Sequence, residues 1–563
     1  AAAGYYALEA TPEEIASDNW AAVFGRAPRV FGITYGNNEG HSMFTSKMNT
    51  NQWSLYLQDN ISWSERFRMS LGVRFELPSY PSLDNNFNEE YYKIDFGGRH
   101  FRTDNVPNAR VSFSPRVGFN WDITGNRNLI LRGGTGLFVG RMPFVWLVSA
   151  VGNSGMGQTS YVVNGEKAAN LRFTASQDEM LKQINATSQT TVPGSPTILS
   201  DDLRMPKTWK ASLAVDAKLP GDIDFTLEGI FNKDLNPVVV SNADIYWDGS
   251  STVDLGHGDV RHKMSYYDAN HSAYLLENAG SKAYYWSVSA QLRKSFDFGL
   301  DLSASYTMSK AKSYTEGIGD QVSSAYNNYR NSINAVNDNE LGYATYVAPN
   351  RLLISASYTL KESKNATSRF SLVYDGYQYA YLGSYAYSRY SYIFSSNINS
   401  DPSAPGNLIY VPASRQELNS WDFAESKVNG QPYTADMQRD DFWTFIEQDD
   451  YLKNHKGQYA ERGGAKMPWH HQLDFKYQRD MSIEIGKTKH ALQLGIDIEN
   501  LPNFLCKDWG LYKQITGNAL LSYKNGQYTY NLVDGQRHVK TSQNYLSTAS
   551  TYRIMFTIRY LFN

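Results

Sequence analysis

The chain has 563 residues, a net charge of −3, 14% aromatic residues and a mean hydropathy of −0.50. No stretch approaches the roughly 18 continuous apolar residues of a membrane-spanning helix, so the composition excludes helical membrane proteins. The lack of a basic excess argues against nucleic acid as a partner, and a single cysteine, Cys506, excludes an intrachain disulfide, a cysteine zinc cluster and an iron–sulfur centre.

The combination of 41 Tyr and 12 Trp with a polar average is compatible with two classes of protein. One is a soluble β-rich protein with surface tyrosines. The other is an outer-membrane barrel, in which alternate residues face lipid and aromatic girdles mark both interfaces. The N-terminal "AAAGYYALEA" lacks a charged segment followed by an apolar one, so either a signal peptide was removed or the gene product starts further upstream.

Residues 1–50 are expected to form an extracellular loop region that follows a truncated strand. A short helix is expected to begin within this region, because its sequence has the pattern of a helix N-terminus: Thr11, Pro12 and Glu14. The segment "RVFGITY" (29–35) is a weaker candidate for one further barrel strand.

From residue 51 onward the chain alternates apolar and polar residues, which predicts strands. In 52–63, Trp53, Leu55 and Leu57 fall on one face, which Asp59 interrupts, and the turn "SERF" leads into a second strand at 67–77. Strand pairs with short turns follow at 117–123 and 129–141, 208–219 and 223–231, 285–295 and 300–310, 351–360 and 366–376, and 471–481 and 490–500. The last two of these pairs are expected to turn at "KESKN" (361–365) and "IEIGKT" (483–488).

The connections alternate between short turns and long polar loops. Loops are expected at 142–206, 236–282, 314–349, 379–467 and 501–548. β-Sandwiches have short connections at both ends, whereas outer-membrane barrels have brief periplasmic turns and long extracellular loops. The predicted fold class is therefore all-β, a large antiparallel transmembrane β-barrel that occupies residues 51–563.

The closing segment "TYRIMFTIRYLFN" (551–563) reads as the last barrel strand. Its apolar row, which includes Ile554, Phe556 and Ile558, is expected to face lipid, while Arg553 and Arg559 face the lumen. About 13 strands result, an odd number, whereas bacterial single-chain barrels have an even one. We therefore expect the chain to be the C-terminal portion of a larger barrel that upstream strands close.

Five blocks carry a resemblance to a known family: "ERGGAKMPWHHQLDFKYQRD" (461–480), "KHALQLGIDIENLPNFLCKDWGLYKQ" (489–514), "NLIYVPAS" (407–414), "PRVGFNWDITGNRNLILRGGTGLFVGR" (115–141) and the "RYLFN" end. Together they resemble Oar-type TonB-dependent outer-membrane receptors of Bacteroidota. The resemblance implies a barrel of about 22 strands. It also implies an upstream plug, N-terminal barrel strands and a TonB-contacting segment, and energy-coupled import across the bacterial outer membrane.

Two segments are candidate metal sites. His470 and His471 are neighbours on a strand and point to opposite faces, so strand-end packing is favoured over a joint ligand role. Asn397, Asn399 and Asp401 alternate like the first oxygen ligands of a calcium loop, but one carboxylate without a turn glycine predicts weak affinity. No metal site and no cofactor is predicted.

Other polar and small residues are expected to line the lumen. Gly134, Gly136 and Gly140 alternate in a strand without a following helix, which argues against a phosphate loop and for tight strand coiling or close approach of a plug. The inward acids Asp216, Asp301, Asp497 and Glu499 read as charges that solvate the lumen. No motif links one of the 10 His to a nucleophile or an acid, so no enzyme activity is expected.

Aromatic residues near the longest loop are the candidate ligand contacts. The run "YQYAYLGSYAYSRYSYIF" carries Tyr377, Tyr379, Tyr381, Tyr385 and Tyr387, and Trp443 lies further along the same loop. These rings could stack on a peptide or a sugar, and girdle formation or loop packing is the alternative.

The leading function is import of an undefined peptide, glycan or metal chelate, with outer-membrane lipid, the upstream segments and the TonB complex as partners and a surface lipoprotein left open. The alternative is a structural scaffold subunit of an outer-membrane complex. A third interpretation, a self-contained porin, requires the chain to close on itself.

Overall fold

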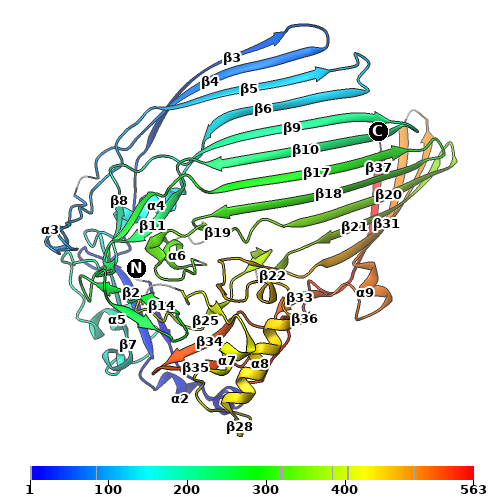
Figure 1. Cartoon of the computed structure of the whole chain (residues 1–563). Coiled ribbons are helices and arrows are strands. Elements are labelled where there is room, and N and C mark those ends of the chain that lie inside the picture. The colour runs from blue at the N-terminus through cyan, green and yellow to red at the C-terminus, as the bar shows by residue number, and fades with distance from the viewer. Residues whose placement is uncertain are drawn as a thin grey trace.

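A computed structural model describes residues 3–83, 85–316, 321–328, 330–382, 385–401, 405–486 and 488–562, without the side chains of 380–386. Its main element is one antiparallel sheet that curves into an open wall (Figure 1). The strands follow one another in chain order: β3 (Asn51–Ser62), β4 (Phe67–Ser79), β5 (Ser112–Asp122), β6 (Leu129–Val139), β9 (Lys207–Leu219), β10 (Ile223–Asp234), β17 (Tyr284–Ser295), β18 (Leu300–Ser313), β20 (Asn350–Ser363), β21 (Ala366–Tyr377), β31 (His470–Ile485), β32 (Thr488–Glu499) and β37 (Arg553–Phe562). The short β19 (Gly342–Tyr343) extends the pairing of β18. The 13 strands of this path are those that the alternation predicts.

The two faces of the wall differ as the alternation requires. One register row joins Phe556, Ile496, Tyr477, Phe370 and Tyr358 across five strands. This apolar row lies on the convex face, where large side chains remain exposed, including Phe556 at 74%. Because successive residues of a strand point to opposite faces, the intervening polar residues line the concave face.

The wall has two edges. β3 pairs only with β4 and β37 only with β32 among the residues that the structure describes. Both edge strands are exposed along most of their length. The sheet is therefore an open part of a barrel and does not close on itself.

The turns and loops lie at opposite ends of the wall, with the long loops gathered at one end (Figure 1). Two of the expected turns are shorter than predicted. β20 continues through Lys361 to Ser363 with a bulge, and β31 continues to Ile485, so the "KESKN" and "IEIGKT" boundaries were wrong. Pairing between Ile485 and Thr488 adds hydrogen bonds that sequence alternation alone does not reveal.

Residues 29–35 form a strand outside the wall. β2 (Val30–Gly36) pairs with β1 (Ala3–Ala7) and β7 (Gln158–Asn164) in a separate sheet, so it is not a further barrel strand. The expected helix is present as α1 (Pro12–Ala16), where Thr11 and Glu14 form a capping box.

Further short elements fold the long loops. The helices of the described residues are α2 (Trp20–Phe24), α3 (Glu89–Tyr92), α4 (Phe144–Gly152), α5 (Gln177–Gln183), α6 (Val322–Asn327), α7 (Arg415–Asn419), α8 (Ala435–Gln448) and α9 (Leu501–Leu505), with 3-10 turns η1 (Gly165–Ala168), η2 (Val336–Asp338) and η3 (Leu452–Asn454). None of the described helices has the length and apolar character that crossing a membrane requires.

Small sheets and hairpins complete these loops. They are formed by β8 (Thr197–Leu199), β11 (Val238–Asn242) and β16 (Tyr274–Asn278); β12 (Ile245–Tyr246) and β15 (Ser265–Tyr266); β13 (Thr252–Asp254) and β14 (Val260–His262); β22 (Ala380–Leu382) and β23 (Tyr385–Tyr387); β24 (Arg389–Tyr390) and β30 (Ala465–Lys466); β25 (Ile393–Phe394), β34 (Ala519–Lys524) and β35 (Gln527–Tyr530); β26 (Tyr410–Val411) and β29 (Gln458–Tyr459); β27 (Ser426–Val428) and β28 (Gln431–Tyr433); and β33 (Tyr512–Ile515) and β36 (Ser542–Tyr545).

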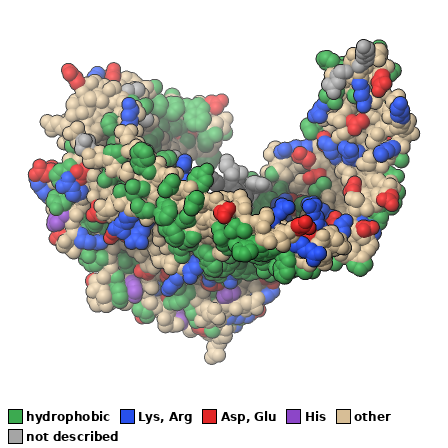
Figure 2. Space-filling view, turned by 90° about the horizontal axis from the view of Figure 1, so that it is seen from above, with side chains coloured by type: hydrophobic (Ala, Val, Ile, Leu, Met, Phe, Trp, Pro, Cys, Tyr) green, Lys and Arg blue, Asp and Glu red, His purple; other side chains and the backbone are tan. Residues whose placement is uncertain are grey.

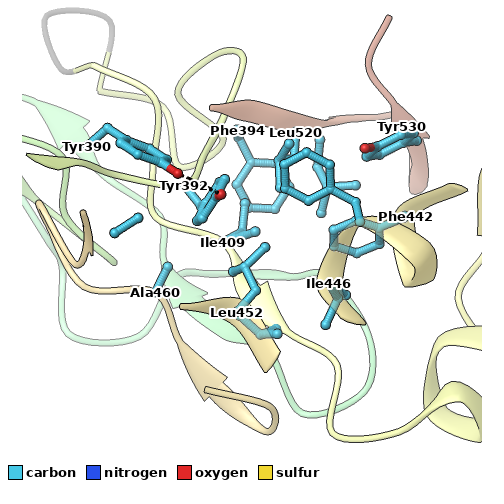
Figure 3. Packing of buried hydrophobic residues seen from close by; sticks show 14 of the residues in the cluster. Tyr390, Tyr392, Phe394, Ile409, Phe442, Ile446, Leu452, Ala460, Leu520 and Tyr530 are labelled. Carbon is cyan, nitrogen blue, oxygen red and sulfur yellow. Dashed lines mark hydrogen bonds between the residues drawn. The ribbon is translucent and has the colours of Figure 1, made fainter. Parts of the chain in front are cut away.

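The largest hydrophobic core lies in the loops and not in the wall. It brings together side chains from the loops after β10, β21 and β32, and Figure 3 shows part of it around Phe394, Phe442 and Leu520. Helix α8 contributes Phe442, Phe445 and Ile446, all buried. We call this cluster, with the segments that carry it, the loop core. Burial of this much apolar surface gives the loops a fixed shape of their own.

Candidate functional site

The concave face of the wall forms the first part of the candidate site. One register row places Asp497, Lys476, Ser371, Ser357 and Asp301 side by side across consecutive strands. Figure 2 shows a hollow beside which Lys, Arg, Asp and Glu side chains gather. The predicted inward direction of Asp497 and Asp301 is thus confirmed.

Ion pairs on this face neutralise neighbouring charges. Arg132 lies 2.8 Å from Asp216 and 3.5 Å from Glu228, and Thr226 donates a 2.7 Å hydrogen bond to Asp216. All three charged side chains remain about a third exposed, between 32% and 40%. Such pairs are screened by water and contribute little to stability, so their main effect is to keep the wall polar.

A cleft of about 510 Å³ lies on this face and extends from β3 to β10. Its lining includes Arg116, Lys210 and Glu228. Arg116 and Lys210 both lie over the ring of Phe138, at 4.7 and 5.4 Å from its centre. The cleft therefore offers cations, a carboxylate and an aromatic ring to a molecule in the hollow.

Glycines bring the strands beside this cleft close together. Gly134 lies opposite Gly118, and a Cβ atom at Gly134 would come within 2.9 Å of the Val117 carbonyl oxygen. A Cβ at Gly136 would lie 2.9 Å from the Pro115 carbonyl oxygen. The predicted role of these glycines in tight strand coiling agrees with this crowding.

The tyrosine run enters the loop core directly from β21. Tyr377 is 3% exposed and its hydroxyl lies 2.6 Å from that of Tyr512, while its ring stacks on Tyr379 at 3.8 Å. Tyr387 is also buried. The side chains of Tyr381 and Tyr385 lie outside the described residues. Tyr377 and Tyr379 therefore take part in loop packing, the alternative to ligand contact.

Trp443 lies on α8 at the margin of the loop core. Its half-buried ring packs against the core on one side, and the Lys456 amino group lies 4.7 Å from the ring centre. Contact of Trp443 and the tyrosines with a ligand stays a prediction.

The candidate calcium loop around Asn397 is held by internal hydrogen bonds. The Asn397 side-chain oxygen accepts from the backbone N–H groups of Asn399 and Asp401, at 3.1 and 3.0 Å. The Tyr326 hydroxyl donates a 3.1 Å hydrogen bond to Asp401. Pro402 lies outside the described residues. These oxygens hold the loop in shape, so their arrangement is that of a turn.

His470 and His471 point to opposite faces, as predicted. His470 is buried and its ring stacks at 3.8 Å on that of Tyr512. His471 lies on the convex side, where its Nδ1 is 2.7 Å from the Tyr374 hydroxyl. The pair therefore packs at the strand end.

Sequence reasoning missed the buried charges of the loops. Arg261 is completely buried, forms a bidentate pair with Asp259 at 2.8 Å, and donates a 2.7 Å hydrogen bond to the Leu408 carbonyl. Arg330 and Arg462 are also buried. An arginine in a polar loop reads as exposed, and the sequence holds no signal that these three would tie separate loops together.

Glu316 is a buried acid in the same region. Its Oε2 accepts from the backbone N–H and the hydroxyl of Thr345, both at 3.0 Å, whereas Oε1 has no hydrogen-bond partner within the described ranges. Burial raises the pKa of Glu316 above its ordinary value of 4.5. The folded loops therefore hold this proton more tightly than the unfolded chain does.

This predicts a pH dependence of loop stability. Because the folded state binds the extra proton, the contribution of Glu316 is fully present below pH 4.5 and is lost as the pH rises through the folded pKa. Glu316→Gln should flatten this part of the profile of melting temperature against pH, measured by near-ultraviolet circular dichroism. Glu425→Gln, at an exposed glutamate, is the control and should keep the slope. An unchanged slope in Glu316→Gln would contradict the assignment.

A polar concave face, an apolar convex face and long loops at one end define an outer-membrane β-barrel protein. The chain belongs to the family described as outer membrane beta barrel domain, which residues 22–505 match. It is accordingly a protein of the outer membrane, and its apolar convex face is the surface that meets lipid.

Comparison with solved structures finds several receptors and transporters. They include the ferric enterobactin receptor PfeA of Pseudomonas aeruginosa (10% identity, TM-score 0.37, 95% of this chain and 58% of that one). The outer-membrane transporter YddB of Escherichia coli has 11% identity and a TM-score of 0.40, and the match covers 95% of this chain and 50% of that one. The siderophore receptor PirA of Acinetobacter baumannii has 9% identity and a TM-score of 0.36, and the match covers 84% of this chain and 47% of that one. The chain thus spans about half the length of these structures. No curated protein matches it.

Proposed function

We propose that the chain is the barrel portion of a TonB-dependent receptor that imports a substrate across the outer membrane. The plug, the first barrel strands and the TonB-contacting segment would lie upstream or in a second polypeptide. The substrate class stays open between peptides, glycans and metal chelates. The protein would act by binding and conducting, without enzymatic chemistry.

The open edges of the wall carry this proposal. Along β3 and β37 one row of backbone N–H and C=O groups is unpaired among the described residues. Each unpaired group in the hydrocarbon of a membrane costs several kcal/mol, so a spanning sheet must close into a ring. Closure by further strands would give a barrel wider than these 13 strands could form, with room for a plug.

The two parts of the candidate site, the concave wall and the loop core, support a transport role. The concave wall offers a polar path, and the cleft beside Arg116 and Lys210 lies along it. The loop core holds the long loops in a fixed arrangement at one end, where a substrate would arrive. Tyr379 and Trp443, both half-buried at the margin of that core, are the ligand contacts that we propose to test first.

A scaffold subunit is the alternative, and the size of the loop core favours it. Loops that share one hydrophobic core resemble a small domain, which is a suitable platform for a surface protein such as a lipoprotein. The self-contained porin has no comparable support, because β3 and β37 do not pair with each other.

The test is the composition of the native protein in outer membranes. We expect a polypeptide heavier than the 63.7 kDa of this chain, or a second chain bound to it, and retention of the native assembly by the periplasmic domain of TonB. The 563-residue segment alone serves as the control and should not be retained. A native mass of 63.7 kDa without a companion would rule out the receptor. Retention of a surface protein without TonB binding would favour the scaffold.

A further inference from the structure

The convex row of β18 changes character at the long-loop end of the strand. Leu302, Tyr306 and Met308 are exposed apolar residues at 40%, 42% and 44%. Lys310 and Lys312 follow at the next two positions of the same row. A lipid-facing row that ends in lysines places ammonium groups at the level where lipid head groups begin.

The neighbouring strands repeat this change. Register pairs align Phe231 and Trp286 with Lys310. One step further along the strands, Tyr284 lies between Lys233 and Lys312. An aromatic belt is thus followed by cations, as at a membrane interface.

Two loop residues join these lysines. Arg389 and Lys466 lie opposite each other in the two-stranded sheet of β24 and β30. Three cations lie over the ring of Tyr343, namely Arg389 at 4.3 Å, Lys312 at 4.4 Å and Lys310 at 5.2 Å from its centre. Partial burial and repulsion by Arg389 and Lys310 lower the pKa of Lys466. We call Lys310, Lys312, Arg389 and Lys466 the cation patch.

Nearby acids compensate only part of this charge. Glu461 lies 3.0 Å from Lys312. The Arg389 guanidinium donates to two backbone carbonyls, which carry no net charge, at 3.3 and 3.2 Å. Arg389 itself is buried, so the ammonium groups of Lys310 and Lys466 are the charges of the patch that an external anion can reach and neutralise.

A cleft of about 680 Å³ adjoins the patch at Lys466 and Trp469. Its two carboxylates are already engaged: Asp450 pairs with Lys453, and Asp449 accepts a 2.6 Å hydrogen bond from the Tyr392 hydroxyl. The cleft thus gives a polar head group space beside the cations, and Trp469 stands at its border with the lipid-facing wall.

We propose that the cation patch binds the phosphate groups of a phosphorylated glycolipid in the leaflet at the long-loop end of the barrel. The acyl chains of that lipid would lie along the exposed row of Tyr306 and Met308. Continuity with the lipid-facing wall distinguishes this source of phosphate from free phosphate in solution. The proposal rests on the outer-membrane location and on the long loops facing outward, and it does not depend on transport.

The test measures retention of a bisphosphorylated glycolipid by the full chain in detergent, by native mass spectrometry. Each lysine near an anionic lipid surface strengthens binding about fivefold. The double variant Lys310→Gln, Lys466→Gln should therefore bind the glycolipid about thirtyfold more weakly. Lys294→Gln is the matched control. It lies in the equivalent convex row of β17 at the short-turn end, 4.6 Å from the ring centre of Phe296, and should bind within about twofold of the original chain.

Heat-modifiable migration of each variant reports correct folding of the barrel. If the double variant fails to fold, Lys466→Gln alone, at a loop position outside the strands of the wall, should still weaken binding about fivefold. Equal retention by the original chain and the patch variants would overturn the proposal. Displacement of the glycolipid by an equimolar amount of inorganic phosphate would show a site for free anions and overturn it as well.

Discussion

Leu213→Arg should destabilise the folded protein in a bilayer by about 2 to 4 kcal/mol, because it places a guanidinium near the middle of the lipid-facing wall. Leu213 is the central residue of β9, is 54% exposed, and lies on the convex face beside Gly133 and Gly229. The free energy of unfolding is measured by reversible urea unfolding of the protein in phospholipid vesicles.

Ser212→Arg is the matched control one residue earlier. Ser212 lies on the concave face beside Gly134, where water solvates an added charge, so the expected change is within about 0.5 kcal/mol. If Ser212→Arg were the more damaging substitution, the assignment of lipid and lumen to the two faces would be reversed. Equal costs would show that neither face meets hydrocarbon.

Trp421→Ala should destabilise the loop core by about 3 to 5 kcal/mol, since it removes a large buried ring and leaves a cavity. Trp421 is 2% exposed, and its ring stacks on Tyr528 at 4.6 Å and also contacts Phe442 on α8. Hydrogen exchange followed by mass spectrometry should show lost protection in α8 and in β35, with the strands of the wall still protected.

Trp509→Ala makes the same change on a ring that is 58% exposed and serves as the control, with protection expected to stay unchanged. A uniform loss of protection in loops and wall after Trp421→Ala would contradict the separation between them. Selective loss in the loops would show that the wall holds its shape without the loop core, as its continuous strand pairing suggests.

The alternation of apolar and polar residues predicted the strands of the wall well, because it depends only on neighbouring residues of each strand. In β37, Phe556 and Thr557 point to opposite faces for the same reason that any two strand neighbours do, and the solvent on each side fixes which type goes where. A short turn such as residues 63–66, between β3 and β4, is likewise set by adjacent residues. The predicted ends of β20 and β31 were less accurate. Each strand continues as far as it can pair with the next one, to Ser363 and Ile485, and this pairing is not visible in the alternation of a single strand.

The candidate site was less predictable. Tyr377 and Tyr387 were expected to be candidates for ligand contact, but whether a loop tyrosine is open or buried depends on partners far along the chain, such as Tyr512. Nothing near Arg261 in the sequence indicates that it meets the Leu408 carbonyl. The same holds for Arg389 and Lys466, which reach Lys310 only after the loops have folded.

The sequence alone therefore determined the number of strands in the wall, the direction of their side chains and the end at which the long loops lie. These features follow from a period of two residues and from the exclusion of unpaired polar groups from hydrocarbon. The tertiary structure decided the rest: the separate sheet of β2, the loop core around Trp421, and the gathering of three cations over the ring of Tyr343. Those features depend on contacts between residues that are distant in the chain. Hydrophobic burial and charge interactions between such residues arise only once the folded chain has brought them together.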